Sequence, residues 1–351
     1  MTKEVLQLNE IMKLAQKIVP EAVDLLSKRY NILRTIYYNQ PIGRRILANK
    51  LGVGERIVRS EINFFKEENL IEINTPGMTI TQDGEEIIEK LKDLIHEFKG
   101  LSDIEKVVKE KLSLKNVIIV PGDVDEDQTV ITEVGKSTSL FLKNLFKDNC
   151  IIAITGGSTV KSVIDNIHKT QNLNNVLVIP ARGGMGRSVE IQANNLAASF
   201  AKKLNGNYKL LHIPDNISST ALNSLLNDKE VKEIVKNINN SDILIYGIGR
   251  ADEMAARREL PQEKITELKT KGAVGEAFGY YFDKNGDIIC ATSTIVVDRK
   301  SLKAIDNLVA VAAGKSKAEA IIATQRNITN STLITDEGAA LEIINILNKI
   351  E

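Results

Sequence analysis

Residues 154–163, with the sequence ITGGSTVKSV, place two glycines and two hydroxyl groups where an apolar run meets a predicted helix. Gly156 and Gly157 would let the backbone approach a ligand closely, and Ser158 or Thr159 could cap the helix or donate to an oxyanion. The amides at a helix start favour negative charge, so this turn could hold a phosphate. The Gly-Lys-Ser/Thr ending of a Walker A loop is missing, and a simple capped turn explains this stretch equally well.

A second candidate follows the next strand-like run, in VIPARGGMGRSVEIQANNLA. Arg182 comes directly after the apolar residues of this run. Ligands of open α/β sheets bind beyond the carboxyl ends of the strands, so we expect Arg182 to face the turn at 156–159. Arg187 and Gln192 could lie nearby. The alternative is a surface arginine in a flexible loop.

The stretch ILIYGIGRADEMAARREL imitates the beginning of a dinucleotide-binding fingerprint. Asp252 occupies the position of the third glycine, and its negative charge would repel a pyrophosphate. No acidic residue ends a second strand about 20 residues later, as the fingerprint requires. The sequence therefore predicts no NAD site. A helix start remains, with Arg250, Arg257 and Arg258 close by.

Two further candidates could complete an anion site. Glu276 lies between small residues and could accept hydrogen bonds from sugar hydroxyls; a helix cap or a surface acid is the alternative. Lys315 and Lys317 follow Gly314 at another strand-to-helix turn. A lysine at a helix start is unfavourable without an anion, which favours pairing with a second phosphate over simple solvation.

The segment from residue 28 to residue 66 holds nine Lys and Arg residues but only two Glu, a local excess that suits a polyanionic partner. We predict helices at 44–51 and 54–67, with Gly52 permitting the tight turn between them. Alternating residues around 76–77 then predict a short hairpin. A helix-turn-helix followed by a wing is typical of DNA binding, and a plain helical hairpin with a polar face is the alternative.

Burial and exposure in these two helices are predicted from their periodicity. The first helix presents an apolar face of Ile46, Leu47 and Leu51. The second is expected to bury Ile57, Val58, Ile62 and Phe65, and to keep on its outer side Glu55, Arg56, Arg59, Ser60 and Asn63. Arg56 and Arg59 could bind guanine in a bidentate manner, whereas Arg44, Arg45 and Lys50 suit phosphate contacts.

The chain of 351 residues is long enough for two domains, and Gly100 is the candidate boundary between residues 1–100 and 101–351. From about residue 115, short β-rich runs alternate with helical runs. We expect strands at VIIV, IIAIT, VLVIP, YKLLHI, DILIYGIG, IIC and IVV. This alternation predicts an α/β fold with a doubly wound, mostly parallel, Rossmann-like sheet.

Composition excludes several classes of protein. Cys150 and Cys290 both abut apolar runs, and there is no C-x-x-C motif or Cys/His cluster, so we expect reduced thiols and no metal site. No apolar run approaches the roughly 20 residues that a membrane helix needs. The N-terminal residues lack the pattern of a signal peptide. We therefore expect a cytoplasmic protein without a membrane partner.

Together these segments resemble the SorC-type family of bacterial sugar-responsive transcription regulators. The resemblance covers nearly the whole chain and is carried by ITGGSTV, IPARGGMGRSVEIQANNLAASFA, ILIYGIGRADEMAARREL, KGAVGEAFGYYFD and AAGKSKAEAI. It implies a winged-helix operator-binding domain and an effector domain similar to sugar-phosphate isomerases and deaminases. It also implies a repressor of a glycolytic operon, an assembly as a homodimer or homotetramer on DNA, and fructose-1,6-bisphosphate as inducer, with no other cofactor.

Carried onto matching positions, the resemblance places eight residues in the effector site: Gly156, Gly157, Ser158, Thr159, Arg182, Gln192, Glu276 and Lys317. Arg257 is a further candidate. The N-terminal helices are less distinctive, so the expected DNA contacts depend on the physical argument given above.

The rival hypothesis is an active sugar-phosphate isomerase or deaminase, which needs an acid–base pair within reach of the sugar. Asp252 and Glu276 could serve, but the histidines do not help: His168 and His212 flank segments predicted to be structural, and His96 lies in the linker helix. We favour a sensor. A turnover assay across sugar phosphates separates the two hypotheses.

Overall fold

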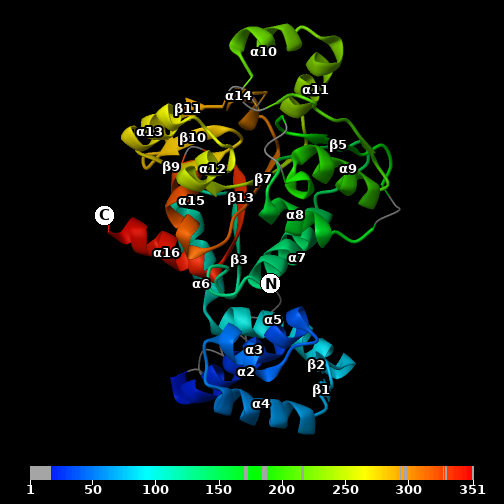
Figure 1. Cartoon of the computed structure of the whole chain (residues 1–351), viewed down its shortest axis with the longest axis vertical. Coiled ribbons are helices and arrows are strands. Elements are labelled where there is room, and N and C mark those ends of the chain that lie inside the picture. The colour runs from blue at the N-terminus through cyan, green and yellow to red at the C-terminus, as the bar shows by residue number, and fades with distance from the viewer. Residues whose placement is uncertain are drawn as a thin grey trace. The chain divides into compact units, whose positions relative to one another are not determined.

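The chain folds as two compact units that divide between Asp103 and Ile104, close to Gly100, where the sequence predicts the boundary (Figure 1). The computed structural model describes residues 17–169, 173–183, 188–214, 217–292, 294–295, 297, 299–326, 328 and 330–349. The apolar residues of LNEIMKLAQKIV, residues 8–19, recur at helical spacing and predict a helix, most of which lies outside the described residues. Each unit is considered by itself.

The N-terminal unit is a winged helix-turn-helix. Its elements are α2 (Pro20–Asn39), α3 (Arg44–Leu51), α4 (Glu55–Glu67), β1 (Ile71–Asn74), β2 (Gly77–Ile80) and α5 (Gln82–Phe98). Gly52 ends α3 in the left-handed conformation, with φ of 63°, as the tight turn requires. β1 and β2 pair antiparallel and form the wing. The expected helix-turn-helix and hairpin are confirmed.

Two isoleucines that we expected in the core of this unit are exposed. Ile46 is 57% exposed and Ile57 is 44% exposed. On α4 the buried stripe consists of Val58, Glu61, Ile62 and Phe65. Glu61 can be buried because Arg29 and Lys28 of α2 bind its carboxylate, at 2.9 and 3.1 Å. The buried face of α4 therefore includes Glu61 and leaves Ile57 at its margin.

The C-terminal unit contains a parallel sheet of seven strands in the order β3-β13-β12-β7-β4-β5-β6. The strands are β3 (Asn116–Val120), β4 (Ile151–Ile154), β5 (Leu177–Pro180), β6 (Asn207–Tyr208), β7 (Ile243–Gly247), β12 (Asn307–Val311) and β13 (Ser331–Asp336). The doubly wound fold is confirmed. The last strand was missed, the strand expected at YKLLHI is limited to Asn207–Tyr208, and the run IVV is not a strand at Ile295 or Val297.

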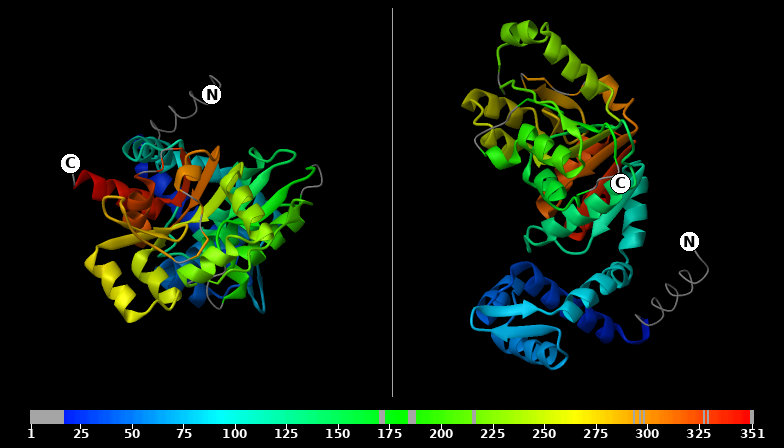
Figure 2. Two further views of the ribbon diagram at one scale, coloured as in Figure 1. Left: turned by 90° about the horizontal axis from the view of Figure 1, so that it is seen from above. Right: turned by 90° about the vertical axis from the view of Figure 1, so that its right-hand side faces the viewer.

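Helices cover both faces of this sheet (Figures 1 and 2). On one face, α7 (Val130–Lys143), α8 (Ser158–Asp165) and α9 (Ala193–Lys203) pack on strand residues such as Ile152 and Ile245. Side chains alternate along a strand, so Tyr246 points to the opposite face. There Gln325 of α15 (Ala318–Gln325) donates to its hydroxyl group at 3.0 Å. The other helices of the unit are α6 (Leu101–Lys111), α10 (Ser219–Leu225), α11 (Lys229–Asn239), α12 (Ala251–Arg257), α13 (Gln262–Thr270), α14 (Arg299–Leu302) and α16 (Glu337–Asn348).

A second, antiparallel sheet, which we did not predict from the sequence, has the order β11-β10-β9-β8. Its strands are β8 (Gly249–Arg250), β9 (Ala273–Ala277), β10 (Tyr280–Asp283) and β11 (Ile288–Ala291). The residues Asp283–Gly286 predict a hairpin turn, and the structure has this turn between β10 and β11, with Asp283 accepting from the amides of Asn285 and Asp287. This small sheet matters for the site because β9 carries Glu276.

Candidate functional site

A cleft of about 740 Å³, counting the part that is open to solvent, lies at the carboxyl ends of the parallel strands. The strand order reverses here: β5 continues the sheet beyond β4, whereas β12 continues it beyond β7. Open α/β sheets bind ligands at such a switch point. The cleft is lined by every effector-site residue selected from the sequence: Gly156, Gly157, Ser158, Thr159, Arg182, Gln192, Arg257, Glu276 and Lys317. Arg187 lies outside the described residues.

The turn from β4 into α8 has the geometry of an anion site. Gly157 has φ of 122°, a conformation that L side chains rarely adopt, and its amide donates to the carbonyl of Ile191 at 2.9 Å. A Cβ on Gly156 would lie 2.5 Å from the same carbonyl oxygen. The first amides of α8, from Ser158 onward, have no intrahelical acceptor. These free amides favour the binding of a negatively charged group.

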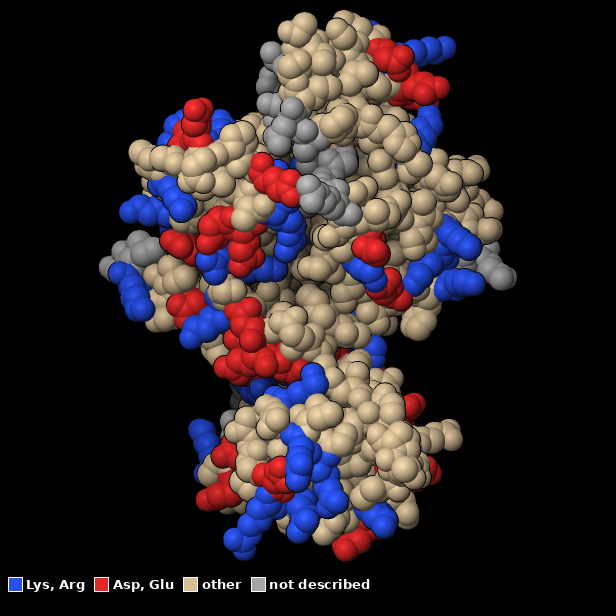
Figure 3. All heavy atoms as spheres, viewed as in Figure 1, with Lys and Arg blue, Asp and Glu red and all other residues tan. Residues whose placement is uncertain are grey.

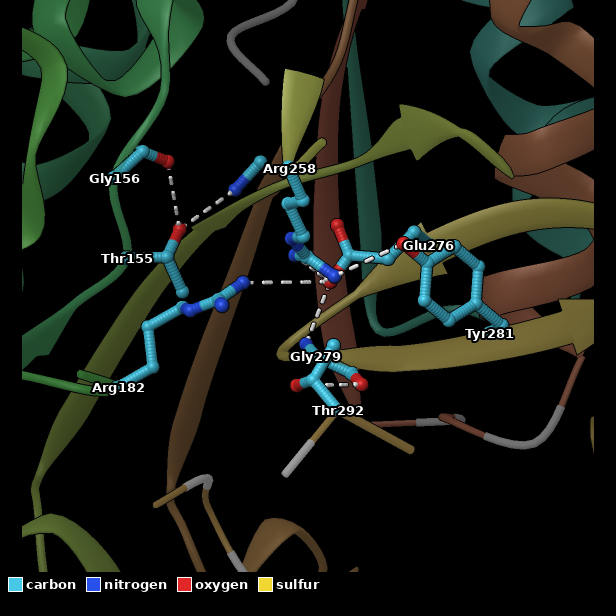
Figure 4. Close-up of polar contacts among 9 residues, drawn as sticks. Thr155, Gly156, Arg182, Arg258, Glu276, Gly279, Tyr281 and Thr292 are labelled. Carbon is cyan, nitrogen blue, oxygen red and sulfur yellow. Dashed lines mark hydrogen bonds and ion pairs between the residues drawn. The ribbon is translucent and has the colours of Figure 1, made fainter. Parts of the chain in front are cut away.

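The side-chain capping that we considered for this helix is absent. Gly157 is the N-cap residue, and no side chain caps α8. The hydroxyl group of Thr155 instead accepts from the amide of Gly247 at 3.2 Å and donates to the carbonyl of Gly156 at 3.3 Å (Figure 4). These bonds tie the turn after β4 to the turn after β7, on either side of the switch point.

Glu276 is buried, with an exposed fraction of 4%, and its Oε1 is the centre of a charged network (Figure 4). Arg258 approaches this oxygen to 2.7 Å and Arg182 to 3.7 Å, and the amide of Gly279 donates to it at 2.6 Å. Arg258 also donates to the hydroxyl group of Tyr281 at 3.3 Å. The three contacts to Glu276 all use Oε1.

The turn after β12 differs from our expectation. Three amides of this turn already donate to carboxylates: Gly314 to Asp336 at 2.9 Å, Lys315 to Asp123 at 3.3 Å and Ser316 to Asp125 at 2.7 Å. The chain itself therefore supplies the anions that compensate for lysines at this helix start. The position of Lys317 at a helix start is no longer an argument for a bound phosphate.

Among the residues that the structure describes, the side chain of Lys317 nevertheless has no ion pair of its own. It is half-buried in the cleft, and its ammonium group makes no hydrogen bond or ion pair within the described part of the chain. Burial lowers the pKa of Lys317, and the positive charge of Arg257 adds to this effect, although the carboxylate of Glu253 opposes it. The cleft therefore holds a lysine whose charged form an incoming anion would stabilise.

The residues that could support enzymatic catalysis are arranged poorly for it. Asp252 lies outside the lining of the cleft and accepts two hydrogen bonds from Arg250, at 3.1 and 2.6 Å. These bonds hold the pKa of Asp252 below its usual value, against the effect of burial. The described lining of the cleft includes no histidine.

Sequence reasoning missed two features of this cleft. Arg258 was noted as a nearby cation, but its role in holding Glu276 depends on β9, a strand that we did not predict. Glu253 lines the cleft and was not selected. In the sequence, the position of Glu253 one turn before Arg257 on the same predicted helix was the available signal.

The expected DNA contacts all lie on exposed positions of the N-terminal unit: Arg44, Arg45, Arg56, Arg59, Ser60 and Asn63. The first two are on α3 and the others on α4. Lys and Arg side chains gather on the face of this unit that Figure 3 shows. Arg45 and Glu55 form an exposed ion pair at 3.5 Å between the two helices. The positions suit DNA binding, and each contact remains a prediction.

In the described ranges, no group of three or more His, Cys, Asp and Glu side chains could hold a metal ion. The helices that the structure describes include none that is long and apolar enough to cross a membrane.

Two family models match the chain. Residues 25–95 match the model described as "CggR N-terminal DNA binding domain", and residues 96–345 match the "Putative sugar-binding domain". The central glycolytic genes regulator of Bacillus subtilis is 39% identical over 337 residues, which cover 96% of this chain and 99% of that protein.

Two solved structures of transcription regulators are similar to this chain. A crystal structure described as "the putative SorC family transcriptional regulator from Enterococcus faecalis" is 36% identical, with a TM-score of 0.64, and covers 69% of this chain and 99% of its own. The full-length sorbitol operon regulator SorC from Klebsiella pneumoniae covers 92% of this chain and 99% of its own, with a TM-score of 0.63. At 18% identity it shows the fold alone. The chain belongs to the SorC-type family of sugar-responsive transcription regulators, and is a regulator rather than an enzyme.

Proposed function

We propose that this chain represses glycolytic genes and leaves its operator when a phosphorylated sugar, most favourably fructose-1,6-bisphosphate, occupies the cleft. The observation that carries the proposal is the half-buried ammonium group of Lys317, which has no ion pair among the described residues. A cation that has lost part of its hydration needs an anion. The similarity to the Bacillus subtilis regulator supports the class of genes.

A ligand with two phosphates suits the distribution of charge in the cleft. One cationic group, Arg182, follows β5 beside the open amides of α8; the other, Lys317, follows β12 and is joined by Arg257. The amides of the Lys317 turn are occupied by carboxylates, so only its side chain is available there. A monophosphate would reach only one of these two cationic positions. Oε2 of Glu276 would accept from a sugar hydroxyl group between them.

Release from DNA requires a difference in affinity. The protein has one arrangement that binds the operator and another that does not. The ligand must have the higher affinity for the second arrangement, because equal affinity for both would leave the equilibrium between them unchanged. The sugar is bound and released unchanged.

A thermal-shift experiment tests the choice of ligand. At a concentration about 100 times its Kd, a ligand stabilises the folded protein by about 2.7 kcal/mol, which raises the Tm of a unit of this size by roughly 5–10 °C. We expect this shift with fructose-1,6-bisphosphate. The same ligand should also release a fluorescent DNA duplex from the protein, the duplex being one that the full chain has selected from a random library. Fructose-6-phosphate should release that duplex much less.

Lys317→Ala tests the site, and Lys315→Ala is its matched control in the same turn, because Lys315 is 61% exposed and lies 3.7 Å from Glu342. The first variant should bind the duplex normally without ligand and lose the response to the bisphosphate; the second should respond like the wild type. A normal response of Lys317→Ala would overturn the assignment of this cleft. Equal release by fructose-6-phosphate would instead exclude the requirement for a second phosphate.

A further inference from the structure

The exposed isoleucine of α4 lies at one end of a covered stripe. Ile57, Glu61 and Phe64 follow one another at four- and three-residue spacing, so they share one side of the helix. Arg29 covers two of them: its guanidinium lies 3.6 Å from the centre of the Phe64 ring and 2.9 Å from the carboxylate of Glu61. Ile57 lies beyond this cover, in the first turn of α4, and is 44% exposed.

Side chains that form hydrogen bonds surround this apolar group. Arg56 precedes Ile57, and Ser60 follows one turn later; both are exposed. In a helix-turn-helix, the first turns of the second helix contact base edges in the major groove. Among the groups that base edges present there, the C5-methyl of thymine is the apolar one. In the major groove, the thymine methyl group is therefore the apolar partner for a branched aliphatic side chain at this position.

We propose that Ile57 is a specificity-determining residue that contacts the methyl group of one thymine in each operator half-site, next to the base that Arg56 contacts. The proposal depends on DNA binding by the N-terminal unit and not on the identity of the effector, and every measurement is made without ligand.

Deoxyuridine gives a direct test, because it lacks only the methyl group and keeps the hydrogen-bonding edge of thymine. The probe is a duplex selected by the wild-type full chain from a random library, in which each thymine is replaced in turn. At one position per half-site, the replacement should weaken binding of the wild type about fourfold. This factor corresponds to the free energy gained when one apolar carbon is removed from water. The same replacement should leave the affinity of Ile57→Ala unchanged.

Ile46→Ala is the matched control. Ile46 is also an exposed isoleucine, at 57%, but it lies on α3, the helix that crosses the DNA backbone in this geometry. This variant should keep the fourfold preference for thymine. An unchanged Tm of Ile57→Ala shows that the substitution leaves the fold intact.

Two results would overturn the proposal. The first is a preference for thymine in Ile57→Ala that equals the wild-type preference at every position. The second is an equal loss of affinity for the thymine and deoxyuridine duplexes, accompanied by a lower sedimentation coefficient, which would assign Ile57 to a contact between two copies of the chain.

Discussion

Lys317 is the residue whose titration should report on the proposed ligand. Burial lowers its pKa; Glu253, Asp125 and Asp336 raise it and Arg257 lowers it, and the net shift is downward from 10.5. The charged form is therefore lost at a lower pH than in an exposed lysine. A phosphate group binds the charged form, and its own second ionisation, with a pKa of about 6, is complete above pH 8.

Affinity for fructose-1,6-bisphosphate should therefore fall as the pH rises from 8 toward 10 in the wild type. Lys317→Arg should show a flatter profile, because a guanidinium group stays charged throughout this range. Calorimetric titrations at several pH values measure both curves. Parallel curves for the two proteins would show that the ammonium group of Lys317 does not contact the ligand.

Individual residues of the cleft were predicted from local sequence, but their partners were not. Gly156, Arg182 and Lys317 stand at ends of strands, and strand ends can be recognised from apolar runs followed by small or charged residues. Glu276 was selected for its carboxylate and from the resemblance, without any indication of its partners. Its burial and its pairing with Arg258 depend on the pairing of β8, β9 and β10, which connects segments far apart in the chain.

At the scale of elements, the two helices of the helix-turn-helix should contribute differently to DNA binding. Arg59 is exposed on α4, and Arg44 is exposed at the start of α3. Loss of a bidentate contact with a base should weaken binding by about 1–3 kcal/mol, and only on DNA that carries the recognised base. A phosphate contact contributes on any sequence and adds about one unit to the salt dependence.

Arg59→Ala should therefore weaken binding to the selected duplex and leave binding to random DNA nearly unchanged. Arg44→Ala should weaken both and lower the salt slope by about 1. Affinities measured by fluorescence anisotropy at several salt concentrations separate the two effects. If Arg59→Ala bound the selected duplex like the wild type, α4 would not be the helix that contacts bases.

Elements with a strong local pattern were predicted well, and those fixed by tertiary contacts were not. The helices α3 and α4 and the wing follow from periodicity, Gly52 and the hairpin residues. The burial of Glu61 does not, because it depends on Arg29 of a different helix. β13 is buried along its whole length, and such a strand lacks the alternation that marks one with an exposed face.

At the scale of the whole molecule, one N-terminal unit offers little surface to DNA. A single module of this kind buries roughly 600–1,000 Å² of protein surface, which gives limited specificity against the many competing sites of a genome. We expect two or more copies of the chain to bind one operator, held together by their C-terminal units, because α3, α4 and the wing must stay open to DNA.

Two linked modules bind about 10²–10⁴ times more tightly than one, provided that both reach their half-sites. The full chain should therefore sediment as a dimer or a tetramer at micromolar concentration, and scrambling one half-site of the selected duplex should weaken binding by at least about a hundredfold. A duplex scrambled outside both half-sites is the control, and its affinity should not change. A monomer in sedimentation that binds the half-scrambled duplex as tightly as the intact one would show that a single N-terminal unit recognises the operator alone.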